Sequence, residues 1–111
     1  NRAEARARLG QTAGAQADLN LVRKRGLATA PDVTATGQAL LDAILIERRI
    51  ELCAEGHRIH DIMRYKKGII RVDNTSTKAS MPYPCKFCIL PIPFEEMDAN
   101  PNMEQNDGYV G

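Results

Sequence analysis

The first part of the chain repeats its apolar residues with the period of an α-helix. Residues 1–9 place Ala3 and Ala7 on one face, with arginines among the polar positions, as in the last turns of a helix whose start is missing. Gly10 follows where such a helix would stop. Alanines on a helix face let a neighbouring helix approach closely, so this segment is expected to be one arm of a hairpin.

A second helical pattern begins after this glycine. Thr12 is placed to cap a helix that Gly26 terminates. Its apolar stripe is formed by Ala15, Leu19 and Val22 at helical spacing, opposite polar residues. Because the connection between the two helices is only a few residues long, the pattern predicts an antiparallel helical hairpin.

The longest periodic segment starts at Thr36 and runs to about Glu55, after a linker that contains Pro31. Its apolar residues lie on two opposite faces, with Leu41, Ile44, Leu45 and Leu52 on one and Ala39, Ala43, Ile46, Ile50 and Cys53 on the other. A helix that is apolar on two faces is typical of one that lies between two layers, as in a stacked helical array. Gly56 is expected to break it, and residues 57–67 to form one or two further turns.

The helical period ends at Gly68. Residues 73–80 have the composition of a loop. Residues 88–93 are expected to be extended, because the two prolines among them lack amide donors and disfavour helical backbone in the residues before them. Short local elements are expected after that segment, namely one helical turn at residues 94–97 and turns at residues 100–101 and 106–108.

Composition narrows the functional classes. The 111 residues suffice for one small domain and are too few for two. Fifteen Lys and Arg against fourteen Asp and Glu give a formal charge of +1, so no overall field attracts nucleic acid or an anionic membrane. No apolar run is long enough to span a membrane. Because the chain begins with Asn1 and not Met, we expect it to be part of a longer protein.

The densest charge pattern lies between residues 47 and 64. Arg48 and Glu55 project among the apolar residues of the long helix, with Glu51 on its flank. Buried charges must be paired, because a stranded one is strongly destabilising. We therefore predict a structural ion network whose members are Arg48, Glu51, Glu55, His57, Arg58, Asp61 and Arg64. A general acid–base or ligand-binding cluster is the alternative interpretation of the same residues.

The cysteines and histidines suggest a further alternative. His57 and His60 together with Cys85 and Cys88 would supply four zinc ligands, although their spacing is not that of a known zinc finger. A single Cys85–Cys88 disulfide is also compatible with the sequence. No phosphate-binding loop, nucleophile elbow or metalloprotease helix appears. The sequence therefore indicates no catalytic site, no metal and no cofactor.

Four motifs follow one another in a fixed order: AEARARLG with DLNLVR (residues 3–10 and 18–23), ERRIEL with EGHR and DIMR (47–52, 55–58 and 61–64), LPIP (90–93), and NPNMEQNDGY (100–109). In order and spacing they resemble the last helical repeat, the signature helix and the C-terminal tail of the SusD/RagB family of outer-membrane nutrient-binding lipoproteins. The similarity covers essentially the whole chain. The family commonly has aromatic residues where this chain has Ile59 and His60, and Cys85 and Cys88 are not part of its pattern.

The resemblance implies a non-catalytic receptor on the bacterial cell surface. Such a receptor is held in the outer membrane by a lipid on an N-terminal cysteine, which this chain lacks. It captures a glycan and caps a SusC-like TonB-dependent transporter during the uptake of polysaccharide or oligosaccharide. The family's ligand residues lie mostly outside the region matched here, so the resemblance assigns no glycan-binding residue to this chain.

These inferences predict an all-α fold: a tetratricopeptide-like helical hairpin array fragment followed by an irregular, proline-containing C-terminal tail. Residues 1–111 are expected to form a single partial domain, with a helical scaffold at residues 1–68 and a loop and extended tail at 69–111. The predicted function is the C-terminal scaffold portion of a larger glycan-binding lipoprotein that works without catalysis or nucleic acid. The alternatives are a free-standing helical module whose exposed arginines dock a partner protein, and a small zinc-binding protein.

Overall fold

A computed structural model describes residues 1–70 and 80–109 of the chain. In these residues the secondary structure is mainly helical, with one pair of two-residue strands, so the predicted all-α class is confirmed. The chain divides into two compact units, Asn1–Asp61 and Ile62–Gly111. The loop predicted at residues 73–80 lies outside the described residues except for its last one.

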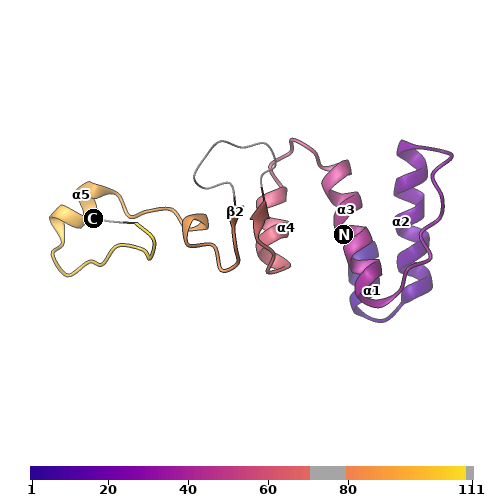
Figure 1. The fold of residues 1–111 in the computed structure, drawn as a ribbon, viewed down its shortest axis with the longest axis horizontal. Coiled ribbons are helices and arrows are strands. Elements are labelled where there is room, and N and C mark those ends of the chain that lie inside the picture. Colours follow the sequence, from indigo (N-terminus) through magenta and orange to yellow (C-terminus); the bar gives the residue numbers. More distant parts are fainter. Residues whose placement is uncertain (71–79, 110–111) are drawn as a thin grey trace. The chain divides into compact units, whose positions relative to one another are not determined.

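Helices α1 (Arg2–Arg8) and α2 (Thr12–Gly26) pack together as the predicted antiparallel hairpin (Figure 1). Gly10 makes the turn with a φ of +75°, a left-handed conformation that glycine adopts without steric cost. Its amide and that of Gln11 donate to carbonyls in the last turn of α1, at 3.1 and 2.8 Å. These two bonds close the helix end, and the predicted stop at Gly10 is confirmed.

The start of α2 differs from the prediction that Thr12 caps it. Thr12 is the first helical residue, and Gln11 occupies the N-cap position without a side-chain hydrogen bond. The tight turn before the helix is the reason. The Thr12 amide donates to the Gly10 carbonyl at 2.9 Å and the Ala15 amide to the Gln11 carbonyl at 3.0 Å, so the helix has already begun at Thr12.

Helix α3 (Gly37–Glu51) begins where predicted, with Thr36 as its N-cap, but it ends four residues before the predicted Glu55. The backbone takes positive φ values at Ala54, 65°, and at Gly56, 77°. Two left-handed residues so close together are incompatible with a continuous right-handed helix. The chain therefore leaves the helical path before the break that the glycine predicted.

The core of the first unit lies where α1, α2 and α3 meet, and its buried members are Ala15, Leu19, Leu40 and Ile44. Leu40 is the most enclosed large side chain, with 1% of its surface exposed. On the opposite side of α3, Ile46 and Ile50 are 58% and 64% exposed. The two predicted apolar faces of this helix are thus reproduced only in part: Leu40, which neither face included, and Ala43 of the second face lie in or against the core, whereas Ile46 and Ile50 are open.

Side-chain amides fix the linker between α2 and α3. The Val33 amide donates to Asn20 Oδ1 at 2.8 Å, and Asn20 Nδ2 donates to the Val33 carbonyl at 3.2 Å. Gln16 Nε2 donates to the Ala35 carbonyl at 2.8 Å. These bonds satisfy linker backbone groups that no helix or strand satisfies, and they hold the linker along α2.

The second unit begins within α4 (Arg58–Arg64), which forms the further helical turns predicted before Gly68. Strands β1 (Ile69–Ile70) and β2 (Ser80–Met81) then pair antiparallel, with Ile69 opposite Met81. The sequence did not predict these strands, because two residues are too few to show the alternation that marks a strand.

The tail of the second unit contains the 3₁₀ turn η1 (Lys86–Cys88) and helix α5 (Phe94–Ala99). The extended segment predicted from Cys88 therefore starts one residue later, at Ile89, whose φ and ψ are −100° and 132°. The Cys88 amide donates to the Cys85 carbonyl at 3.1 Å, which keeps Cys88 in the turn. Helix α5 confirms the predicted helical turn, and the chain also turns after residues 100 and 106 as expected.

Candidate functional site

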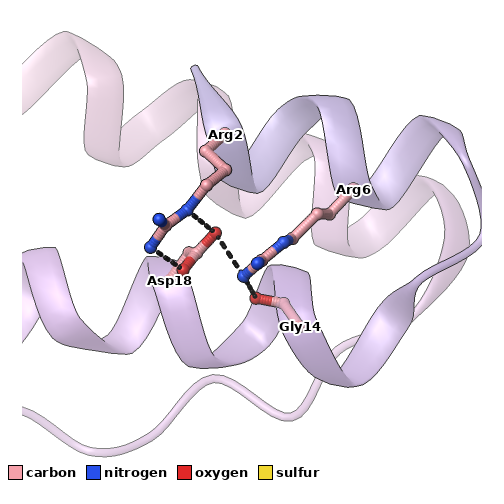
Figure 2. A network of polar contacts seen from close by, with 4 residues as sticks. All are labelled: Arg2, Arg6, Gly14 and Asp18. Atoms are coloured by element: carbon pink, nitrogen blue, oxygen red, sulfur yellow. Dashed lines mark hydrogen bonds and ion pairs between the residues drawn. The ribbon is translucent and has the colours of Figure 1, made fainter.

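Asp18 of α2 lies between two arginines of α1 (Figure 2). Arg2 contacts both carboxylate oxygens, Nε at 2.9 Å and Nη2 at 2.7 Å, and Arg6 Nη1 reaches Oδ2 at 2.9 Å. The hydrogen bonds from Arg2 lower the pKa of Asp18 below its ordinary value, and the same bonds raise the pKa of Arg2. This three-residue group ties the two arms of the hairpin together.

Sequence reasoning missed the Asp18 group, although the sequence contained a signal for it. In an antiparallel hairpin that turns at Gly10, residues equally distant from Gly10 face each other, which pairs Arg2 with Asp18 and Arg6 with Gly14. Gly14 leaves room for this contact, because a Cβ built there would lie 3.2 Å from Cδ of Arg6. Arg6 Nη1 accordingly also donates to the Gly14 carbonyl at 3.3 Å.

Two members of the predicted ion network meet directly. Arg48 of α3 donates from Nε to Oδ2 of Asp61 on α4 at 2.9 Å. The Arg48 side chain is 17% exposed and the Asp61 side chain 7%, so most of this pair is removed from water. Arg48 Nη1 also contacts the side-chain oxygen of Asn1. The pair thus bridges the turn that separates α3 from α4.

Two other members of the predicted network contact residues outside it. Glu51 forms an ion pair with Arg25 of α2. The Arg64 guanidinium lies 4.9 Å from the centre of the Tyr65 ring. The side chains that remain are exposed, and they belong to Glu55, His57 and Arg58. One further ion pair joins α2 to α3, between Arg23 Nη1 and Glu47 Oε2 at 3.2 Å.

Two hollows of the first unit border the Arg48–Asp61 pair. One, of about 230 Å³, lies among α1, α2 and α3 and is lined by Leu19, Ile44 and Arg48 among others. The second, of about 320 Å³, is lined by residues of the 52–58 turn together with Arg48 and Asp61. Where a charged side chain at the wall of either hollow has an ion-pair partner in the structure, that pair joins two helices. Such pairs hold the helices in position.

The zinc alternative is wrong. Cys85 and Cys88 form a disulfide, so neither can supply a thiolate to a metal, and Cys53 is the free cysteine of the described residues. Within residues 1–70 and 80–109, no three His, Cys, Asp or Glu side chains are close enough to hold a metal ion.

No helix in the described part of the chain has the length and apolar content that crossing a membrane requires.

Comparison with known proteins identifies the family of this chain. A family model for the SusD family matches residues 1–109. The chain belongs to the SusD family. The comparison with curated proteins finds no match for this SusD-family chain.

Three solved structures resemble the SusD-family chain over nearly its whole length. A "Putative sugar binding protein" from Bacteroides vulgatus ATCC 8482 is 38% identical over 97% of the chain, with a TM-score of 0.75. A SusD superfamily protein from the same organism is 36% identical over 98%, with a TM-score of 0.77. A SusD-like protein from Bacteroides fragilis NCTC 9343 is 29% identical over 96%, with a TM-score of 0.66. The chain spans 26%, 25% and 23% of these structures, about a quarter of each.

Proposed function

We propose that this chain is the C-terminal scaffold portion of a cell-surface glycan-binding lipoprotein of the SusD family. The whole protein would work with a SusC-like TonB-dependent transporter in the uptake of polysaccharide or oligosaccharide, by binding and without catalysis. The match of the family model to residues 1–109 carries this proposal, and the name of the 38% identical structure supports a sugar as the ligand. Because the chain spans about a quarter of its structural relatives, binding is assigned to the longer protein.

The composition of the first unit supports a scaffold role for it. Residues 1–61 contain no Phe, Tyr or Trp, and Tyr65 is the first aromatic residue of the chain. Sites that hold the apolar face of a sugar ring usually offer an aromatic side chain to it. The glycan pocket is therefore proposed to lie outside this unit.

The ion pairs support the same role. Arg48–Asp61 and the Asp18 group each join two helices. Both side chains of Arg48–Asp61 are largely shielded from water, whereas the arginines that bind Asp18 are 70% and 36% exposed. Removing one partner of a buried pair such as Arg48–Asp61 is strongly destabilising, whereas an exposed pair contributes little. We propose that the charged residues between positions 47 and 64, among which Arg48 and Asp61 pair directly, serve to fix the helices and take no part in chemistry.

The disulfide supports a location outside the cytoplasm. Disulfides persist in oxidising surroundings and are rare where thiols are kept reduced. The Cys85–Cys88 bridge therefore agrees with export to the cell surface, where a lipid anchor of the longer protein would hold it.

A binding experiment on the intact protein tests the proposal. The protein is purified from its native outer membrane and from a recombinant source, and the recombinant sample is applied to a panel of oligosaccharides and polysaccharides. The expected results are saturable binding to at least one glycan class, unchanged by metal chelation, and co-purification of a β-barrel transporter from the membrane. Turnover of the bound glycan, or absence of both glycan binding and transporter, would overturn the proposal.

A further inference from the structure

The second unit contains two antiparallel segments, residues 85–92 and 105–109, that are joined through side chains and are here termed the clasp. Three side chains of the second segment reach backbone groups of the first, in the pairs Gln105 with Ile92, Asn106 with Leu90, and Tyr109 with Ile89. The donor–acceptor distances in these pairs lie between 2.6 and 2.9 Å. These hydrogen bonds join residues 89–92 of the first segment to the second segment.

Two prolines explain why side chains take the place of a strand ladder here. Pro91 and Pro93 have no N–H, so Ile92 holds the one amide donor between them. That amide donates to Gln105 Oε1 at 2.8 Å, and Gln105 Nε2 donates back to the Ile92 carbonyl at 2.9 Å. One glutamine therefore satisfies both backbone groups of Ile92, as a partner strand would.

The Cys85–Cys88 disulfide closes the other end of the clasp. The bridge encloses two residues, Lys86 and Phe87, in the turn η1. Both of them contact the second segment: Lys86 Nζ lies 2.6 Å from Oδ2 of Asp107, and the Phe87 ring packs edge-on against the Tyr109 ring with 5.7 Å between centroids. The turn that the disulfide constrains is thus the turn on which the tail rests.

Gly108 shows how closely the tail approaches this turn. Its φ is +96°, and a Cβ built on it would lie 2.8 Å from Cβ of Lys86. A separation below 3 Å leaves no room for any other residue unless the backbone moves. The tail therefore fits against the turn η1 only while the backbone of that turn keeps this conformation.

We propose that the Cys85–Cys88 disulfide is a redox-sensitive staple that holds the clasp closed, and that reduction opens it. A dithiol reductant attacks Cys88, the more exposed of the two cysteines, and displaces the Cys85 thiolate. Its second thiol then releases Cys88, so that two electrons and two protons pass to the cysteines and the reductant becomes a cyclic disulfide. A chain-entropy estimate for a loop of four residues predicts that closure favours the ordered turn by roughly 20-fold.

Hydrogen exchange on the intact protein tests the staple. Exchange of peptides that cover residues 89–93 and 105–109 is followed by mass spectrometry with and without dithiothreitol, and alkylation confirms that both cysteines are reduced. The expected result is roughly 20-fold faster exchange of the Ile92 amide, which donates to Gln105 across the clasp, on reduction. Helix α2, which contains no cysteine, is expected to exchange at an unchanged rate.

Two variants serve as controls. Cys53→Ser removes the free cysteine and keeps the bridge, so it is expected to respond to reductant as the wild type does. Cys85→Ser combined with Cys88→Ser is expected to show fast exchange without any reductant. Unchanged exchange of the clasp in protein whose bridge is shown to be reduced would overturn the proposal, and so would finding two free thiols at these positions in the protein purified from its membrane.

Discussion

Replacing Arg48 with Ala tests the proposed role of the charged residues in helix α3. The substitution leaves Asp61, whose side chain is 7% exposed, without the guanidinium that lies 2.9 Å from it. Breaking a buried ion pair by removing one partner costs about 3–5 kcal/mol. Because Arg48 itself is 17% exposed, we expect the lower end of that range, a loss of about 3 kcal/mol in the free energy of unfolding.

The assay is urea denaturation of the intact protein, with four comparison variants. Arg49→Ala removes an exposed arginine from the same helix and is expected to change the free energy of unfolding by less than about 0.5 kcal/mol. Arg48→Met keeps an apolar stem and removes the charge, so it separates packing from pairing. Asp61→Asn, alone and combined with Arg48→Ala, completes a double-mutant cycle, in which the two changes should be clearly non-additive. A loss below about 0.5 kcal/mol for Arg48→Ala, equal to that of an exposed site, would show that the Arg48–Asp61 pair does not stabilise the fold.

Three further predictions concern the hairpin and the tail. Because the pKa of folded Asp18 is lowered, its stabilising contribution should be complete above about pH 4 and disappear as the pH falls through the folded pKa. The melting temperatures of wild type and Asp18→Asn, measured from pH 7 to pH 2, should therefore differ above that pH and converge below it. Gly10→Ala should lower the free energy of unfolding by about 1 kcal/mol, because its φ of +75° strains any residue with a Cβ, whereas Gly26→Ala should be neutral or stabilising by about 0.5 kcal/mol in the same urea titration. Gln105→Leu should lower the free energy of unfolding by about 1–2 kcal/mol. It should also speed hydrogen exchange of the Ile92 amide, because that amide loses its acceptor.

Each of these predictions has a contrary outcome. A constant difference in melting temperature across the acid range would show that the Asp18 ion pairs do not stabilise the fold. Equal effects of the two glycine substitutions would show that the left-handed turn at Gly10 is not required. An Ile92 amide that exchanges as slowly in Gln105→Leu as in the wild type would show that the glutamine does not bond it in solution.

Local sequence was sufficient to predict the helical hairpin. Alanines at helical spacing and a glycine between the two patterns determine both arms and the turn, because these signals lie within a few residues of the structure that they specify. The length of α3 was overestimated for the same reason. The residue types at positions 52–55 are compatible with a helix, and no local sequence signal predicts the left-handed backbone at Ala54.

Contacts between distant residues were harder to predict. The pairing of Asp18 joins two helices, and finding it requires the register of α1 against α2, which the turn at Gly10 sets. The bond between Gln105 and Ile92 joins residues thirteen positions apart without any periodic pattern. The helical wheel predicted that Arg48 is paired, yet it could not choose Asp61 as the partner, because the chain turns between them.

The central claim is that the charged residues between positions 47 and 64 hold a scaffold together and do not bind the ligand. Isothermal titration calorimetry of the intact Arg48→Ala protein, at a temperature where circular dichroism shows it to be folded, tests this most directly. With the glycan that the panel identifies, we expect the same dissociation constant as for the wild type alongside a reduced free energy of unfolding. Loss of glycan binding by a variant whose fold and stability equal those of the wild type would contradict it.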